Sequence, residues 1–109
     1  MSLKIEQGFR YQGSNWWKWW LWIDGPEEGL DQIDHVIYVL HKTFPDPVRT
    51  INDRASKFRL QTSGWGVFTV TARLVLKTGQ EERLKHDLVL EYPDGKRRTG
   101  TGGFLPSKI

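Results

Sequence analysis

The chain contains no cysteine, and this absence excludes both a disulfide framework and any thiol chemistry. It is consistent with a reducing compartment such as the cytoplasm, which is the location we expect. No apolar run approaches the ~20 residues that a membrane-spanning helix needs. Residues 1–12 alternate charged with apolar side chains and lack the hydrophobic stretch of a signal peptide. The sequence therefore predicts a protein with no membrane partner.

An excess of charge of one sign is also missing. Sixteen Lys and Arg residues against thirteen Asp and Glu residues give a net charge of only +3. Much of the excess lies in one short basic run, residues 96–98. Nucleic-acid-binding domains usually carry a basic stripe across a whole face. We therefore do not expect a nucleic-acid partner.

The patterns that would indicate catalysis or metal binding are absent as well. The three histidines are His35, His41 and His86, and the first two lie roughly 20 Å apart along an extended strand, too far to share a metal. No serine lies in a nucleophile-elbow motif, and the glycine-rich residues 100–103 lack the strand–helix context of a phosphate loop. We predict a protein that is not an enzyme and has no metal or cofactor. His86 lies among leucines, so we expect a hydrogen-bonded core or edge histidine.

What the sequence does have is an alternation of apolar and polar residues with a period of two, typical of β-strands. No segment shows convincing helical periodicity, and residues 25–31 and 45–55 are predicted as loops. The predicted strands are short and separated by turn signals, and they span 3–11, 16–24, 33–41, 57–61, 68–76, 83–92 and 97–101. This spacing predicts a single all-β domain over residues 1–109, an immunoglobulin-like β-sandwich. Its core is expected to span residues 3–101, followed by a flexible tail over 102–109.

Tryptophan is unusually abundant, with five of the six tryptophans between Trp16 and Trp22. The alternation puts Trp17 and Trp19 on the inward face, where they are predicted to be core aromatics. Trp20 and Trp22 face outward, so they should cover a sheet edge, meet a partner or line a site. A surface on which carbohydrate rings stack remains an alternative for these two side chains.

Two short motifs about twenty residues apart carry the functional prediction. They are Leu40–Pro45 (LHKTFP) and Ser63–Phe68 (SGWGVF), and each lies where a predicted strand meets a loop. Each places an aromatic ring beside small polar groups, and two rings with a hydroxyl and a free backbone N–H suit a flat, neutral amide. The spacing alone leaves a second interpretation open, in which both rings only plug the core between two turns.

Three blocks of the sequence together resemble the YEATS domain. They are Asp24–Glu27, Val36–Pro45 and Ser63–Phe68, and the resemblance covers roughly residues 16–92. The stretch from Asp53 to Leu60 is most similar to the prokaryotic branch. The resemblance implies a sandwich of about eight antiparallel strands. It also implies a non-catalytic module that binds acetylated or crotonylated lysine on another protein or peptide.

The resemblance also implies a role for each motif residue. Phe44 and Trp65 would be the rings on either side of the acyl amide. The Thr43 hydroxyl and the backbone N–H of Trp65 would bond that amide, and His41 would support the hydroxyl.

Four further residues are assigned to the walls of the same slot. Gly64 and Gly66 would keep it open, Phe68 would form its floor, and Trp22 would line its far end. Val67 departs from the family pattern, since an acidic residue is often found there.

A hypothesis from another class remains beside this one. The chain would be an immunoglobulin-like interaction scaffold within a larger signalling or defence assembly, without acyl-lysine binding. Contacts would then run through Trp20, Trp22 or a sheet edge, and the two motifs would serve folding alone.

Overall fold

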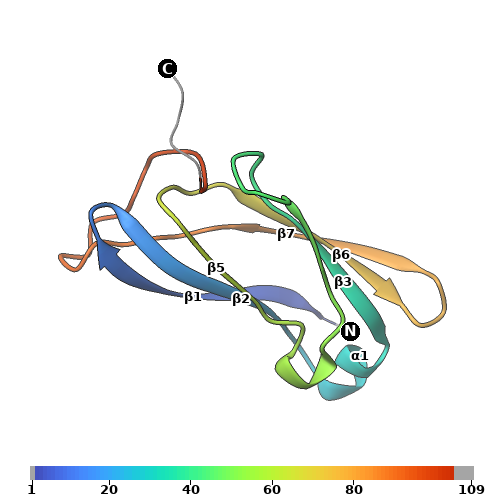
Figure 1. The fold of residues 1–109 in the computed structure, drawn as a ribbon. Coiled ribbons are helices and arrows are strands. Elements are labelled where there is room, and N and C mark those ends of the chain that lie inside the picture. The colour runs from blue at the N-terminus through green and yellow to red at the C-terminus, as the bar shows by residue number, and fades with distance from the viewer. Residues whose placement is uncertain (1, 105–109) are drawn as a thin grey trace.

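A computed structural model describes residues 2–104, which form two antiparallel sheets packed face to face (Figure 1). One sheet has the strand order β1-β2-β5 and the other the order β4-β3-β6-β7. The seven strands among the described residues are β1 (Lys4–Gly13), β2 (Trp16–Asp24), β3 (Ile33–Val39), β4 (Val48–Ile51), β5 (Leu60–Gly64), β6 (Thr69–Leu76) and β7 (Glu81–Asp87). The predicted β-sandwich is confirmed.

Two short elements lie where the sequence predicted loops. The helix α1 (Glu27–Asp31) follows Pro26 and carries Glu27 and Glu28 in its first turn, where carboxylates favour the positive end of the helix dipole. The edge strand β4 pairs with β3 between Val36↔Ile51 and Val39↔Val48. An element of four or five residues is too short to show a periodicity, which is why the pattern missed both. A single 3₁₀ turn, Arg54–Ser56, begins in the same predicted loop as β4 and ends one residue beyond it.

The predicted strand 83–92 leaves its sheet earlier than expected, because β7 ends at Asp87. Beyond it the chain moves toward β1, where the Gln7 side chain bonds both backbone groups of Val89. Gln7 Oε1 accepts the Val89 N–H at 2.9 Å, and Gln7 Nε2 donates to the Val89 carbonyl at 2.7 Å. The predicted last strand, 97–101, is reduced to isolated bridges at Arg97 and Thr101. Side-chain contacts and a few isolated backbone bonds, such as that from the Arg98 N–H to the Leu90 carbonyl at 2.8 Å, thus take the place of a continuous sheet ladder in this part of the chain.

The core lies between the sheets and contains the large aromatic side chains. Trp17 and Trp19 are fully buried, which confirms their prediction as core residues. Tyr38 is equally buried, and its hydroxyl donates to the Phe58 carbonyl at 2.7 Å. Burial raises the pKa of the Tyr38 phenol, so the hydroxyl stays protonated and available as a donor.

Trp20, on the outer face of β2, covers its own sheet. Its indole lies against Gly8 of the neighbouring strand β1, where a Cβ atom would overlap the ring. The Arg59 guanidinium stacks on the ring at 5.2 Å from its centroid. Trp20 therefore has partners within the chain.

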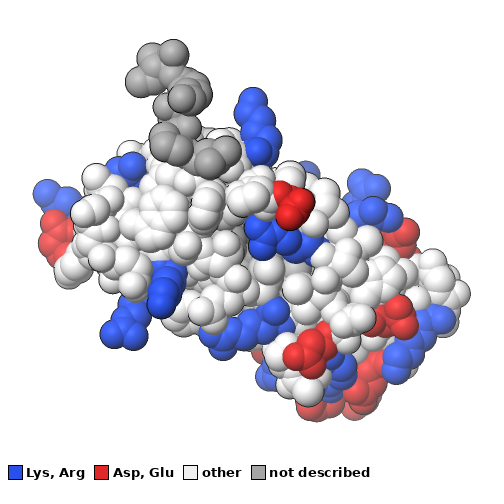
Figure 2. Space-filling model, in the orientation of Figure 1, with Lys and Arg blue, Asp and Glu red and all other residues white. Residues whose placement is uncertain are grey.

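The surface shows mixed charges. On the face drawn in Figure 2, acidic and basic side chains gather together near the end that carries α1, and a largely uncharged stretch occupies the left half of the view. Within residues 2–104 no helix is both long and apolar enough to cross a membrane.

The opposite end of the sandwich gathers three segments that are distant in sequence (Figure 1). They are the connection after β3, the connection from β5 to β6, and residues 100–104 near the C-terminus. Both sequence motifs lie in the first two of these segments.

Candidate functional site

The first motif forms a tight turn that aims a threonine hydroxyl. After β3, the Phe44 N–H donates to the His41 carbonyl at 3.0 Å and closes the turn. The Thr43 N–H donates to His41 Nδ1 at 3.3 Å, so this nitrogen acts as an acceptor. Thr43 Oγ1 lies 3.0 Å from the same nitrogen and therefore donates its proton to it. The lone pairs of the Thr43 hydroxyl are left to accept a hydrogen bond from another group.

Phe44, in the same turn, belongs to the core. Only 2% of its surface is exposed. Its ring meets Trp19 edge-on at 5.8 Å and Phe68 at 5.6 Å between centroids. One of the two rings assigned to the slot is thus part of the apolar cluster that stabilises the fold.

Trp65, in the second motif, is half-buried and is held by an arginine. Arg98 Nε donates to the Trp65 carbonyl at 2.9 Å, and the guanidinium lies 5.8 Å from the centre of the indole. Arg98 also donates to the Tyr92 hydroxyl at 2.9 Å. The sequence had shown Arg98 only as part of a basic run, since a contact across 33 residues leaves no local signal.

Residues 100–104 lie alongside the second motif. The Trp65 N–H donates to the Gly103 carbonyl at 2.8 Å, and the Val67 N–H donates to the Gly100 carbonyl at 2.9 Å. In the other direction the Gly102 N–H donates to the Val67 carbonyl at 3.1 Å. Gly102 and Gly103 are buried. Residues 102–104, which the sequence predicted as the start of a flexible tail, are thus packed against the second motif, and residues 105–109 lie outside the described part of the chain.

One peptide group joins the two motifs. The carbonyl of the Gly103–Phe104 peptide accepts the Trp65 N–H, and the N–H of the same peptide donates to Thr43 Oγ1 at 3.2 Å. The Phe104 ring then packs 6.0 Å from Phe44 and 5.5 Å from Trp16. The hydroxyl and the backbone N–H that the sequence assigned to a ligand amide are thus both bonded to an amide of this chain.

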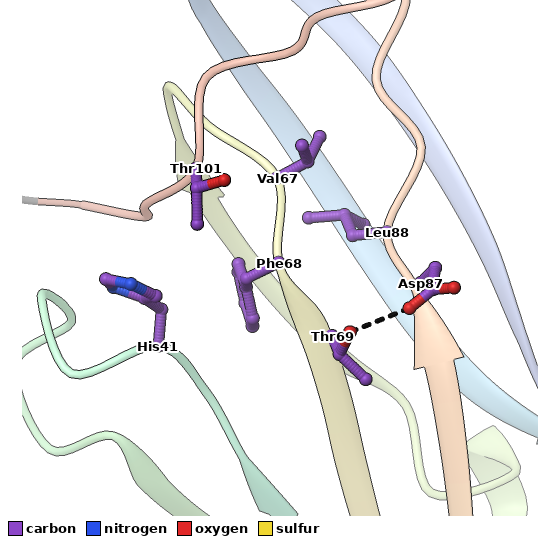
Figure 3. A pocket seen from close by; sticks show the side chains of 7 residues that line it. All are labelled: His41, Val67, Phe68, Thr69, Asp87, Leu88 and Thr101. Carbon is purple, nitrogen blue, oxygen red and sulfur yellow. Dashed lines mark hydrogen bonds between the residues drawn. The ribbon is translucent and has the colours of Figure 1, made fainter.

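A cavity of about 480 Å³ opens beside this contact (Figure 3). Its lining comes from the turn after β3, the β5–β6 connection, the start of β6, the end of β7 and the C-terminal segment: His41, Val67, Phe68, Thr69, Asp87, Leu88 and Thr101. At its rim Thr69 Oγ1 donates to Asp87 Oδ1 at 2.7 Å. The volume lies within the range of roughly 300–1,000 Å³ that is usual for small-molecule sites.

The structure gathers seven of the eight predicted site residues at this end of the sandwich: His41, Thr43, Phe44, Gly64, Trp65, Gly66 and Phe68. Gly64 and Gly66 face the backbone of residues 100–103 at close range, so the space they leave is filled by the chain itself. The functional roles of the seven stay predictions.

Trp22 is the exception, because the structure places it away from the other seven. It pairs with Glu6 of β1, five residues along β2 from Trp17, which pairs with Gly64. That separation is roughly 16 Å along an extended strand. Trp22 instead lines a separate cavity of about 240 Å³ with Ser56, Lys57 and Arg59. Trp22 was assigned to the slot because it aligns with an aromatic residue of the family pocket. That assignment did not take into account its position along β2.

The remaining histidine and metal predictions concern other parts of the chain. His86 Nε2 lies 2.6 Å from Gln7 Oε1, which confirms a hydrogen-bonded edge histidine. Burial lowers the pKa of His86, with a smaller opposing effect from the charges of Asp87 and Glu6. Residues 2–104 contain no cluster of three or more His, Asp or Glu side chains suited to a metal ion.

Known proteins share the sequence pattern and the fold. A family model described as the prokaryotic YEATS domain matches residues 17–89. The Protein AF-9 homolog of Eremothecium gossypii is 31% identical over 90 residues, which cover 75% of this chain and 42% of that protein. The chain therefore spans less than half the length of this relative.

Two solved structures show the same fold. The Yaf9 YEATS domain bound to H3K27ac superposes with a TM-score of 0.68 at 22% identity, covering 84% of this chain and 75% of that chain. The Yaf9 YEATS domain recognising an H3K122suc peptide superposes with a TM-score of 0.66 at 22% identity, covering 79% and 68%. At this identity the likeness shows the sandwich and its topology.

Proposed function

The chain belongs to the prokaryotic YEATS domain family, and from that premise we propose that it is a non-catalytic module that binds acylated lysine. Two of its structural neighbours are YEATS domains, one bound to H3K27ac and the other recognising an H3K122suc peptide. Under this proposal the partner is a protein or peptide that carries an acetyl, crotonyl or related group on a lysine.

The single observation that carries the proposal is the amide between Thr43 and Trp65. The Gly103–Phe104 peptide donates to the Thr43 hydroxyl and accepts from the Trp65 N–H. An acylated lysine presents the same secondary amide, with one N–H and one carbonyl. The two protein groups therefore have the spacing and the polarity that an acyl-lysine amide needs.

Under this proposal, the polarity of the site would favour an acylated lysine over an unmodified one. A lysine ammonium has donors only, so it offers nothing to the Trp65 N–H. It would also lose its hydration among Phe44, Trp65 and Phe68, which carry no charge to replace water. The neutral amide avoids both penalties.

The cavity beside His41 and Phe68 provides space for the aliphatic part of the ligand. Both residues line the cavity, and both touch the amide-binding turn: His41 through Thr43, and Phe68 through Phe44. A planar crotonyl group also gains from stacking on aromatic rings.

The proposal is tested by removing only the hydroxyl of the first motif. Thr43→Val keeps the shape of the side chain but leaves the ligand N–H unsatisfied, which costs about 1–3 kcal/mol. Affinity for an acetyl-lysine peptide, measured by NMR titration, should fall about 5- to 150-fold. Thr50→Val on the exposed edge strand β4 is the matched control and should leave affinity unchanged.

The same titration with an unmodified lysine peptide should give no shifts at Trp65 or Phe44. The proposal would be contradicted if millimolar acetyl- and crotonyl-lysine peptides left the spectra unchanged both in the wild-type chain and in a Gly103→Ala variant, whose added methyl group pushes residue 103 off the Phe44 ring.

A further inference from the structure

We propose that residues Gly100–Phe104, here named the C-terminal strap, are an internal ligand of the amide site that acylated lysine must displace. The inference rests on the proposed function, since it adds a competitor to the same site.

The strap pairs with the second motif over a very short length. Three backbone hydrogen bonds join it to Trp65 and Val67, around a single parallel bridge between Val67 and Thr101. Every named strand pair in the described chain is antiparallel and forms a ladder of four or more residue pairs. The strap is therefore an addition at the edge of the site, outside both sheets.

The strap reaches across to the first motif with the same peptide group that bonds Trp65. The Phe104 N–H bonds a side-chain oxygen, Thr43 Oγ1, which no sheet ladder would involve. That oxygen can act as an acceptor because the hydroxyl uses its proton to donate a hydrogen bond to His41 Nδ1. The strap thus uses the polar groups of the site in the way that the proposed ligand would.

Gly102 and Gly103, two of the three glycines of the strap, fit against the two rings of the site. A Cβ atom on Gly103 would overlap the Phe44 ring and lie 2.8 Å from Thr43 Oγ1. A Cβ atom on Gly102 would overlap the Trp65 ring, and this residue also has a φ of +152°. Only a backbone without side chains passes this close to both rings.

The strap is held by a short set of local contacts among the described residues. They include the three backbone bonds to the second motif, the bond to Thr43, the ring contacts of Phe104 with Phe44 and Trp16, and the packing of Gly102 and Gly103 on the two rings. Against them stands the conformational entropy of five residues, three of which are glycines and lose the most freedom on ordering. Release of the strap frees both polar groups at once.

The experiment compares the wild-type chain with Gly103→Ala, which forces the strap off the Phe44 ring. Gly79→Ala is the control for a strained glycine substitution away from the strap, because Gly79 lies in the β6–β7 turn with a φ of +92° and a Cβ atom there would have no neighbour within 4 Å. Phe104→Ala is a second release variant that adds no volume, in case Gly103→Ala disturbs the fold.

Two measurements separate the strap from the ligand. Amide hydrogen exchange at Trp65 reports whether the Gly103 carbonyl still covers its N–H, and it needs no ligand. We expect exchange up to about tenfold faster in both release variants and no change in Gly79→Ala. Titration with an acetyl-lysine peptide should show about tenfold tighter binding in the release variants, which corresponds to a strap that is closed about nine-tenths of the time.

A third measurement follows the strap in the wild-type chain. At saturating acetyl-lysine peptide, the Gly102 N–H should lose its protection, because its acceptor Val67 no longer faces it. The Trp65 N–H should stay protected, because the ligand carbonyl takes the place of Gly103.

The outcomes are distinct. Faster exchange at Trp65 with unchanged peptide affinity would overturn the competition while leaving the proposed function intact. Unchanged exchange in both release variants would show that the strap does not leave the site, and would overturn the inference directly. Faster exchange at Trp65, together with no peptide binding by the wild-type chain or by either release variant, would refute the proposed function and, with it, any competition.

Discussion

Phe44 and Trp65 are assigned to one site, yet they are held by different forces. Phe44 is 2% exposed and packs edge-on against Trp19 within the core. Trp65 is half-buried and is held by Arg98 and by the backbone of the strap. One wall of the site is therefore fixed by the hydrophobic core. The other wall depends on polar and cation–π contacts that can change without unfolding the domain.

The largest expected effect comes from truncating each ring in turn. Phe44→Ala should lower the free energy of unfolding by about 3–5 kcal/mol, as is usual for buried phenylalanine. Trp65→Ala should cost less than about 2 kcal/mol, because a half-buried ring loses only part of its transfer energy. Urea denaturation of both variants measures the difference. Equal losses would show that both rings are core plugs, the interpretation that the spacing had left open.

The next effect tests whether Arg98 holds the Trp65 ring in position for the ligand. Arg98→Lys keeps the charge but loses the Nε bond to the Trp65 carbonyl and the planar stack on the indole. We expect acetyl-lysine affinity to fall by a factor of about 3–10, corresponding to about 1 kcal/mol. Arg97→Lys, on an exposed side chain beside Glu91, is the matched control. If both substitutions weaken binding alike, general charge and not the position of Trp65 is responsible.

The smallest expected effect concerns His86, which lies outside the site and tests whether polar contacts elsewhere also affect the stability of the domain. His86 lies at the contact of β7 with β1, and its pKa is lowered below the ordinary value of about 6.5. The unfolded chain therefore binds this proton more readily than the folded chain, and stability decreases as the pH falls below about 6.5.

This pH dependence is measured by thermal denaturation at pH 7.5 and pH 5.5. The wild-type chain should melt at a lower temperature at pH 5.5, and His86→Gln should remove part of that decrease. An identical decrease in the variant would assign the effect to other groups.

The sequence was most informative where side chains alternate. The β2 pattern correctly placed Trp17 and Trp19 in the core, and the leucines around His86 predicted its environment. The two motifs correctly indicated that residues near 41–44 and 63–68 meet at one end of the sandwich. In each case the local pattern and the tertiary contacts agree.

The strap was missed for a physical reason. Glycines leave no side-chain pattern, so a glycine-rich end looks the same whether it is free or packed against two rings. Its order depends on the Trp65 N–H and the Thr43 hydroxyl, which are 38 and 61 residues away from their partners. The alternation also continues through Leu88 and Leu90, although the backbone has already left the sheet at Asp87.

The close approach of Gly64 to the strap has an evolutionary consequence. A Cβ atom on Gly64 would lie 2.5 Å from the Gly103 carbonyl oxygen, and one on Gly66 would lie 2.8 Å from that of Gly100. We therefore expect substitutions in the second motif and in the strap to be coupled, because a larger residue in the motif is compatible only with a strap that has moved away. When relatives of this chain lack the motif glycines, we expect them to lack the strap glycines as well. The two segments should therefore change together in evolution.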